Sequence, residues 1–237
     1  MYDVLIIGCG IIGSAVAYEL SKYQLSVGIL EKYNDVANGA TKANSAILHA
    51  GYDPHPGTDM ARLNTLGIKL AKEICEKLDV ERRECPSFVL AFSEEEMKTV
   101  QVLYDRGIAN GVNVKILNGD QVREIEPEIS KEVVGALYSE DSAIVDPWGY
   151  AIAMAEVAVT NGVVLHRENK VRAIGIGYVR IAYLSFGREE IKLGAGIFPK
   201  KLIVIFIVRN VKLIPVIKPC SFEVLIGYFK AKRFYHM

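Results

Sequence analysis

The sequence predicts an α/β fold that contains a parallel sheet. Two short apolar runs, Val4–Ile7 and Val27–Leu30, have the length and unbroken hydrophobicity of strands that are buried on both faces. Between them, apolar side chains recur at helical spacing up to Leu20, and no proline interrupts them. A strand, a helix and a second strand within about 30 residues have the length of a βαβ unit, in which the two strands are parallel.

Composition narrows the class of protein. The chain has 237 residues, of which 51% are hydrophobic and 24% are charged, so it is long enough to bury a sizeable core. No apolar stretch reaches about 18 residues, which predicts that no segment crosses a membrane. The net charge of zero argues against a nucleic-acid partner. The four cysteines lack metal-ligand spacing and the N-terminus lacks a signal peptide, so we expect no metal and a cytoplasmic location.

Local signals predict the next elements in order. Residues 34–58 are rich in Gly, Asn, Ala and Pro, which is typical of a long loop. Residues 60–78 carry apolar side chains at helical spacing with charged side chains opposite, which indicates an amphipathic helix. A strand at 88–92 precedes Ser93 and Glu96, which form a capping box that begins another helix.

Glycine and proline mark the elements of the following stretch. Asn110 and Gly111 end the capped helix, and Pro127 ends a short helix at 120–125. Asp146 and Pro147 supply the N-cap and the first residue of a helix that ends at 161–162. Strands are predicted at 112–117, 133–138 and 163–166, and around Val171 and Val179.

The last part of the chain differs chemically from the rest. From Ile191 onward it carries nine Lys or Arg residues and a single acid, Glu223. The run 202–208 is strand-like, but the residues after it follow no period, so the sequence assigns no fold to 201–237. An unpaired apolar run without a neighbouring acid would favour aggregation.

Three glycines directly after the first strand form the motif that carries chemistry. In Gly8-x-Gly10-x-x-Gly13 the first glycine permits a tight turn, the second lets the backbone approach a pyrophosphate, and the third lets helix and strand pack closely. Glu31 ends the second strand, where its carboxylate could accept hydrogen bonds from ribose hydroxyls and would repel a 2′-phosphate. This order predicts a Rossmann-like dinucleotide site and leaves NAD and FAD open. The alternative is a glycine-rich turn in an ordinary α/β protein.

The segment 39–52, GATKANSAILHAGY, resembles the flavin-facing loop of FAD-dependent oxidoreductases of the D-amino acid oxidase superfamily. Within that superfamily it is similar to L-2-hydroxyglutarate oxidase and to the anaerobic type of glycerol-3-phosphate dehydrogenase. Its small residues would let the backbone lie against a flat ring, although each polar residue taken singly also suits a surface loop. A second segment, 193–198, resembles a late family turn near the pyrophosphate. The resemblance implies FAD, held by Gly8, Gly10, Ile11, Ile12, Gly13, Glu31, Lys32, Thr41, Lys42, Asn44, Ser45, Val171 and Gly196.

His49, inside the flavin-like loop, is the candidate catalytic residue. Oxidation of an α-hydroxy acid needs a base that takes the hydroxyl proton while the α-hydrogen leaves as hydride, and the ordinary pKa of histidine suits that task. The resemblance also allows a covalent link between this histidine and the flavin. The third alternative is a histidine that is hydrogen-bonded in a packed loop.

These observations predict a Rossmann-like FAD-binding domain with an inserted, incomplete α+β substrate domain. Residues 1–80 and 146–200 would form the FAD-binding domain, 81–145 part of the substrate domain, and 201–237 a basic tail. The implied activity is oxidation of a small 2-hydroxy acid or of glycerol-3-phosphate, with an electron acceptor that the sequence does not identify. The alternatives are an inactive dinucleotide-binding remnant and an NAD-dependent dehydrogenase, for which no catalytic constellation is visible.

Overall fold

The computed structural model describes residues 2–175, 178–183, 188–192 and 203–206. These residues belong to two compact units. The first unit takes Met1–Lys42 together with the chain from Ala151 onward, and the second takes Ala43–Tyr150. The domain boundaries that we expected, at residues 80 and 146, stay a prediction.

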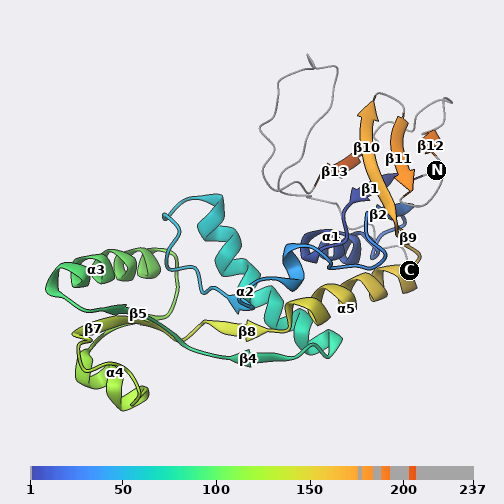
Figure 1. The fold of residues 1–237 in the computed structure, drawn as a ribbon. Coiled ribbons are helices and arrows are strands. Elements are labelled where there is room, and N and C mark those ends of the chain that lie inside the picture. Colours follow the sequence, from blue (N-terminus) through green and yellow to red (C-terminus); the bar gives the residue numbers. More distant parts are fainter. Residues whose placement is uncertain (1, 176–177, 184–187, 193–202, 207–237) are drawn as a thin grey trace, which may run out of the picture. The chain divides into compact units, whose positions relative to one another are not determined.

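A parallel sheet forms the centre of the first unit, which confirms the predicted fold class (Figure 1). Its strand order is β13-β1-β2-β9, where β1 is Val4–Ile7, β2 is Val27–Leu30, β9 is Val164–His166 and β13 is Ile203–Phe206. All three pairings are parallel. Both β1 and β2 are almost entirely buried, as their unbroken hydrophobicity predicts.

Helices pack on this sheet through small and branched side chains. α1 (Ile11–Leu20) connects β1 to β2, and α5 (Pro147–Thr160) leads to β9. Their buried alanines Ala17, Ala155 and Ala158 belong to one core cluster with Ile6 and Ile29 of the sheet. A separate antiparallel sheet of β10 (Asn169–Gly175), β11 (Tyr178–Tyr183) and β12 (Arg188–Lys192) follows β9.

The structure differs from the sequence-based expectation at the end of the parallel sheet. Ile203–Phe206 forms β13, which pairs with β1 in register from Val4↔Ile203 to Ile7↔Phe206. The apolar run that we expected to be unpaired is therefore paired with β1. This pairing gives hydrogen-bond partners to backbone groups of β1 that would otherwise be unpaired at a sheet edge. The remaining residues of the predicted tail lie outside the described part of the chain.

The second unit is built from antiparallel sheets and three helices. β5 (Ser87–Ala91), β7 (Gly135–Ser139) and β6 (Val114–Asn118) form one sheet in that order. α3 (Glu94–Ala109) packs on this sheet, and Ser93 Oγ accepts from the Glu96 N–H, which is one half of the predicted capping box. In place of the other half, Glu96 Oε2 accepts from the Phe92 N–H. α4 (Gly119–Ile125) has a complete capping box, formed by Asn118 and Gln121. α2 (Asp59–Leu78) is the predicted amphipathic helix, and Thr58 caps it.

A second small sheet of this unit was not predicted. Its order is β3-β8-β4, from β3 (Ile47–Leu48), β8 (Ala143–Val145) and β4 (Arg82–Glu84). The β3 strand has two residues and β4 reads Arg-Arg-Glu, so neither shows an apolar run or an alternation. Only pairing with β8 makes them strands.

Candidate dinucleotide site

The turn after β1 requires glycine at two positions for two different reasons. Gly8 has a φ of +93°, in the left-handed region that strains residues with a side chain, and its N–H donates to the Leu30 carbonyl at 2.8 Å. A Cβ on Gly13 would lie 2.0 Å from the Gly8 carbonyl oxygen. No side chain fits in that space, so α1 approaches the end of β1 as closely as two backbones allow.

Gly10 is the N-cap of α1 and offers no side chain to the helix terminus. That task falls to Thr41, a buried residue of the short 3₁₀ helix Ala40–Lys42, whose hydroxyl accepts from the Ile11 N–H at 3.0 Å. A Cβ on Gly10 would stand 3.1 Å from this hydroxyl. The first N–H of α1 bonded within the helix is that of Ser14, which donates to the Gly10 carbonyl at 2.9 Å.

The Glu31 side chain is buried against the same turn. It follows β2 directly and is 5% exposed. Its Oε2 accepts from the Cys9 N–H at 2.7 Å, and its Oε1 accepts from the Tyr33 N–H at 3.0 Å. Two of about four acceptor positions on the carboxylate are used in this way. The structure thus places Glu31 and the glycine turn together, as the βαβ reading requires.

Cys9, between the first two glycines, forms hydrogen bonds to several parts of the turn, and the sequence analysis did not predict this role. Its N–H donates to Glu31, its carbonyl accepts from the Ala37 N–H at 2.8 Å, and its Sγ lies 3.6 Å from Ser14 Oγ. The pKa of this thiol is raised to about 11, chiefly by burial; the Ser14 hydrogen bond lowers it, and the nearby Glu31 and Asp35 carboxylates raise it by smaller amounts. The thiol is therefore neutral at physiological pH.

Residues at the end of β9 and just after it form hydrogen bonds with the segment that begins at Glu31. The Glu31 N–H donates to the His166 carbonyl and the Asn169 N–H donates to the Glu31 carbonyl, both at 2.8 Å. Arg167 Nη1 donates to the Asn34 carbonyl at 3.3 Å. These partners are more than 130 residues apart, and no local signal in the sequence links them.

The other expected cofactor residues are spread more widely. Lys32 lies with its Nζ 4.5 Å from the Tyr33 ring centre, and Lys42 Nζ donates to Asn38 Oδ1 at 2.7 Å. Ile12 is 57% exposed at the start of α1. Val171 lies in β10 opposite Ile181, beside an irregularity in the strand register. Gly196 lies outside the described residues.

Three expected site residues fall in the second unit. Asn44 Oδ1 accepts from the Ala46 N–H at 2.7 Å, which shapes the loop locally. Ser45 and His49 are exposed. The boundary between the two units falls between residues 42 and 43, so the flavin-like loop 39–52 belongs partly to each unit.

Comparison with known proteins identifies the family. Residues 3–198 match the family model described as FAD dependent oxidoreductase. The chain belongs to this family. The resemblance drawn from the glycine motif and the loop is thereby confirmed, and FAD is the cofactor assigned to the chain.

Several members of the family are similar over most of this chain. Over 172 residues it is 50% identical to a glycerol 3-phosphate dehydrogenase of Caloramator mitchellensis, covering 72% of this chain and 36% of that protein. It is 37% identical over 150 residues to a mitochondrial L-2-hydroxyglutarate dehydrogenase of Dictyostelium discoideum, covering 62% of this chain and 33% of that one. The FAD-bound L-alpha-glycerophosphate oxidase of Mycoplasma pneumoniae is 35% identical with a TM-score of 0.71, covering 76% of this chain and 49% of that one. The chain thus spans between a third and a half of these relatives.

Proposed function

We propose that this member of the FAD dependent oxidoreductase family supplies the dinucleotide-binding part of an enzyme that oxidises glycerol-3-phosphate. The observation that carries the proposal is the buried Glu31 carboxylate beside an α-helix whose N-cap is glycine. An ADP moiety needs these two features at one turn: an acceptor for ribose hydroxyls and free amides for phosphate.

The turn of this chain fits the cofactor sterically and electrostatically. A Cβ on Gly8 would meet nothing within 4 Å, and Gly10 leaves the N-terminus of α1 open except for the Thr41 hydroxyl. The N–H groups of Ile12 and Gly13 precede the first bond within the helix, so they are free to bind pyrophosphate oxygens. Thr41, by holding the Ile11 N–H, fixes the start of the helix.

Further contacts are assigned as part of the same proposal. Lys32 and Lys42 would add positive charge near the phosphates, and Val171 would offer its backbone near the adenine. Asn44 and Ser45 would bind the flavin end of the cofactor, and Gly196 would lie near the pyrophosphate. These assignments rest on the family resemblance and on the small and polar character of the loop.

His49 is the proposed base. Bound FAD supplies the acceptor for the hydride that leaves the substrate carbon. An imidazole nitrogen of His49 would take the hydroxyl proton, and its exposure leaves the ring accessible to a substrate. A covalent link to the flavin through the same ring is the alternative role.

The substrate proposal follows the relatives. Identity is 50% with a protein named as a glycerol 3-phosphate dehydrogenase and 33% to 37% with those named as L-2-hydroxyglutarate dehydrogenases. Both substrates carry an anionic group and a secondary alcohol, so the same base chemistry serves either one. We place the enzyme in the cytoplasm, consistent with the free thiols of Cys9, Cys75 and Cys85. The described part of the chain contains no helix that is long and apolar enough to cross a bilayer.

Calorimetric titration with ADP and FAD tests the nucleotide proposal. Glu31→Ala removes the ribose acceptor and should weaken both ligands by about 1 to 3 kcal/mol. Glu19→Gln, which removes an exposed acid of α1 that pairs with Lys22, is the control and should leave both affinities unchanged. Equal affinities for the wild type and Glu31→Ala would contradict the dinucleotide assignment.

Flavin reduction by each substrate tests the proposed substrate and the proposed role of His49. In a fusion of this chain with the unmatched part of a relative, glycerol-3-phosphate should reduce FAD faster than L-2-hydroxyglutarate. His49→Asn should slow reduction by about 100-fold or more if the imidazole is the base. Wild-type reduction in this variant, with no change in flavin retained on a denaturing gel, would exclude both roles of His49. A fusion that binds FAD but is reduced by neither substrate would favour the inactive remnant.

A further inference from the structure

The sheet β5-β7-β6 of the second unit has two edges, and different kinds of residue occupy them. In the described part of the chain, β5 and β6 each pair only with β7. β6 carries Lys115, an exposed charge that pairs with Glu140. β5 reads Ser-Phe-Val-Leu-Ala and contains neither a charged residue nor a proline. Charges and prolines are devices that keep an edge strand from pairing with other strands, so β5 is an unprotected edge.

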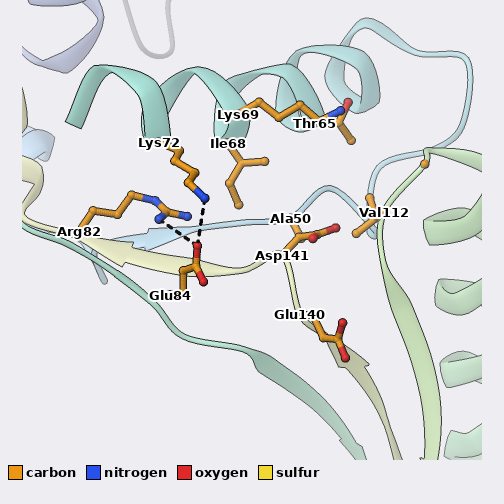
Figure 2. Close-up of a pocket in the computed structure, with 11 residues that line it drawn as sticks. Ala50, Thr65, Ile68, Lys69, Lys72, Arg82, Glu84, Val112, Glu140 and Asp141 are labelled. Atoms are coloured by element: carbon orange, nitrogen blue, oxygen red, sulfur yellow. Dashed lines mark hydrogen bonds and ion pairs between the residues drawn. The ribbon is translucent and has the colours of Figure 1, made fainter. Parts of the chain in front are cut away.

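The strand before β5 shows how this unit protects another edge. β4 lies at the end of the order β3-β8-β4, and it reads Arg-Arg-Glu. Figure 2 shows Lys72 of α2 and Arg82 converging on the Glu84 carboxylate, at 3.5 Å from Nζ and 3.6 Å from Nη1. Charged side chains therefore occupy β4, and they stop before β5 begins.

A hydrogen bond at the end of the sheet shows how the backbone groups of β7 are divided between its two neighbours. The Gly119 N–H donates to the Val134 carbonyl at 2.9 Å, just beyond the pair Asn118↔Gly135 of β6 and β7. In an antiparallel ladder, a bond at this position means that the pair itself is not bonded, and bonded and non-bonded pairs alternate. The N–H and C=O of Gly135 are therefore directed at β5, and so are those of every second residue up to Ser139.

The same alternation identifies the backbone groups of β5 that face the open edge. The register places Val89 opposite Leu137, which is one of the residues directed at β5. Val89 therefore bonds to β7, and Phe88 and Leu90 on either side of it direct their N–H and C=O groups away from β7. The Ala91 carbonyl has the direction that this alternation requires, because it accepts from the N–H of the residue before β7 at 2.9 Å.

The two ends of this edge are blocked, whereas its centre is open. The next N–H in the outward series, that of Phe92, donates to Glu96 Oε2 at 2.6 Å. In the other direction the series reaches Pro86, which has no N–H. The outward groups of Phe88 and Leu90 lie between these ends. An extended segment of about five residues matches this footprint, because its own backbone groups alternate with the same period.

The side chains of β5 indicate the character of that segment. Val89 packs against the core between the sheet and α3. Phe88 and Leu90 point to the opposite face, because side chains alternate along a strand, and both are only half-buried there. The Phe88 ring has one aromatic neighbour on that face, Tyr138, at 5.1 Å between ring centres. An added strand with apolar side chains would extend this face and bury it further.

We propose that the β5 edge receives a β-strand from the part of the family fold that this chain does not span. The chain covers 36% of the Caloramator mitchellensis dehydrogenase and 49% of the Mycoplasma pneumoniae oxidase, so at least half of each relative lies outside the match. The occupant is thus an apolar, extended segment of that unmatched part, held by main-chain hydrogen bonds. The proposal goes beyond the proposed function, because it concerns the second unit and depends on family membership rather than on the nucleotide turn.

Hydrogen exchange at single amides tests the pairing. In the full chain alone, the N–H groups of Phe88 and Leu90 should exchange at least about tenfold faster than that of Val89. The chain is then co-expressed with the unmatched part of the Caloramator mitchellensis dehydrogenase, and the complex is isolated through a tag on this chain. In the complex, exchange at Phe88 and Leu90 should slow by about tenfold or more. Ile116, whose N–H faces away from β7 at the β6 edge, is the control amide and should not change.

A pair of variants at one position separates the backbone donor from the side chain. Leu90→Pro removes an outward N–H and no bond to β7, a change that edge strands tolerate. Leu90→Ala is the matched control, because it shortens the same side chain and keeps the N–H. The proline variant should form at most about a tenth of the complex that the alanine variant forms. The exchange comparison uses the unmodified chain, so it decides the proposal even if Leu90→Pro fails to fold.

The outcomes that contradict the proposal are distinct from one another. Slow exchange at Phe88 and Leu90 in the chain alone would overturn it. Analytical ultracentrifugation then shows whether a second copy covers the edge, in a dimer, or the chain's own residues cover it, in a monomer. Failure to isolate a complex, or a complex with unchanged exchange at these amides, would also contradict it. The nucleotide proposal fails separately, if neither ADP nor FAD binds, whatever the exchange at β5.

Discussion

At the scale of single residues, the dinucleotide turn is defined by how closely backbone atoms approach one another. Gly13 lies against the Gly8 carbonyl, and Gly8 itself has a positive φ. Glu31 and Cys9 join the turn to the end of β2 through a hydrogen bond of 2.7 Å. Each contact restrains another, so small changes at these residues should have large effects on stability.

Gly13→Ala is expected to destabilise the chain by about 3 kcal/mol, because its Cβ would overlap backbone rather than a movable side chain. Gly67→Ala is the matched control, since a Cβ at this exposed position of α2 meets nothing within 4 Å. It should stabilise the helix by about 0.5 to 1 kcal/mol. Urea unfolding of both variants measures the two effects, and similar unfolding midpoints would show that α1 is less tightly packed than described.

The raised pKa of Cys9 predicts a dependence of stability on pH. The folded thiol titrates near pH 11, whereas the thiol of an unfolded chain titrates near pH 9. Above pH 9 the unfolded state releases a proton that the folded state keeps, so stability should be complete below pH 9 and fall as the pH rises towards 11. The loss attributable to Cys9 is about 2 to 3 kcal/mol.

Comparing the wild type with Cys9→Ala isolates this contribution from other groups that titrate at alkaline pH. The free energy of unfolding of the wild type should decrease more steeply between pH 9 and 11 than that of the variant. Parallel curves would mean that the thiol is not desolvated in the folded chain.

At the scale of elements, the parallel sheet depends on a strand from the far end of the chain. β13 covers the free edge of β1, so residues 203–206 contribute backbone hydrogen bonds to the sheet that positions the cofactor turn. A run of four apolar residues buried in a parallel sheet has the same sequence character as an unpaired one. This is why the sequence analysis assigned the run to an aggregation-prone tail.

Proline substitutions test this pairing. Successive N–H groups along a strand at a sheet edge point alternately towards the neighbouring strand and away from it. Val204→Pro and Ile205→Pro should therefore differ, and the variant that removes a donor directed at β1 should lose about 3 kcal/mol in thermal unfolding. The other variant serves as the control. Two equally neutral variants would contradict the pairing of β13 with β1.

At the scale of the whole molecule, the chain carries the cofactor turn but matches less than half of the length of the relatives named above. We expect the 237-residue chain to bind FAD weakly and to show no turnover of glycerol-3-phosphate or L-2-hydroxyglutarate with an artificial electron acceptor. The reason is that a flavin needs polar groups near its pyrimidine end and protein on both faces of the ring. The same assay on a fusion with the unmatched part of the Mycoplasma pneumoniae oxidase is the positive control. Turnover by the chain alone would overturn this expectation.

The sequence by itself determined the βαβ unit and its dinucleotide motif, whereas the family and FAD followed from the resemblance of the loop 39–52. This was possible because the signals are local: an apolar run, glycines at fixed offsets, and an acid at the end of a strand. The start of α3 was predicted for the same reason, since Ser93 bonds to a group three residues away. Asn118 caps α4 over the same spacing, but the sequence analysis did not identify it.

Only the tertiary structure decided what depends on contacts between distant residues. It placed Thr41 over the N-terminus of α1 and Arg167 against Asn34, and it made strands of Arg82–Glu84 and Ile203–Phe206. It also brought cations of α2 and β4 together around the Glu84 carboxylate. Hydrogen bonds and ion pairs of this kind form across long loops, so no periodicity or spacing in the sequence records them.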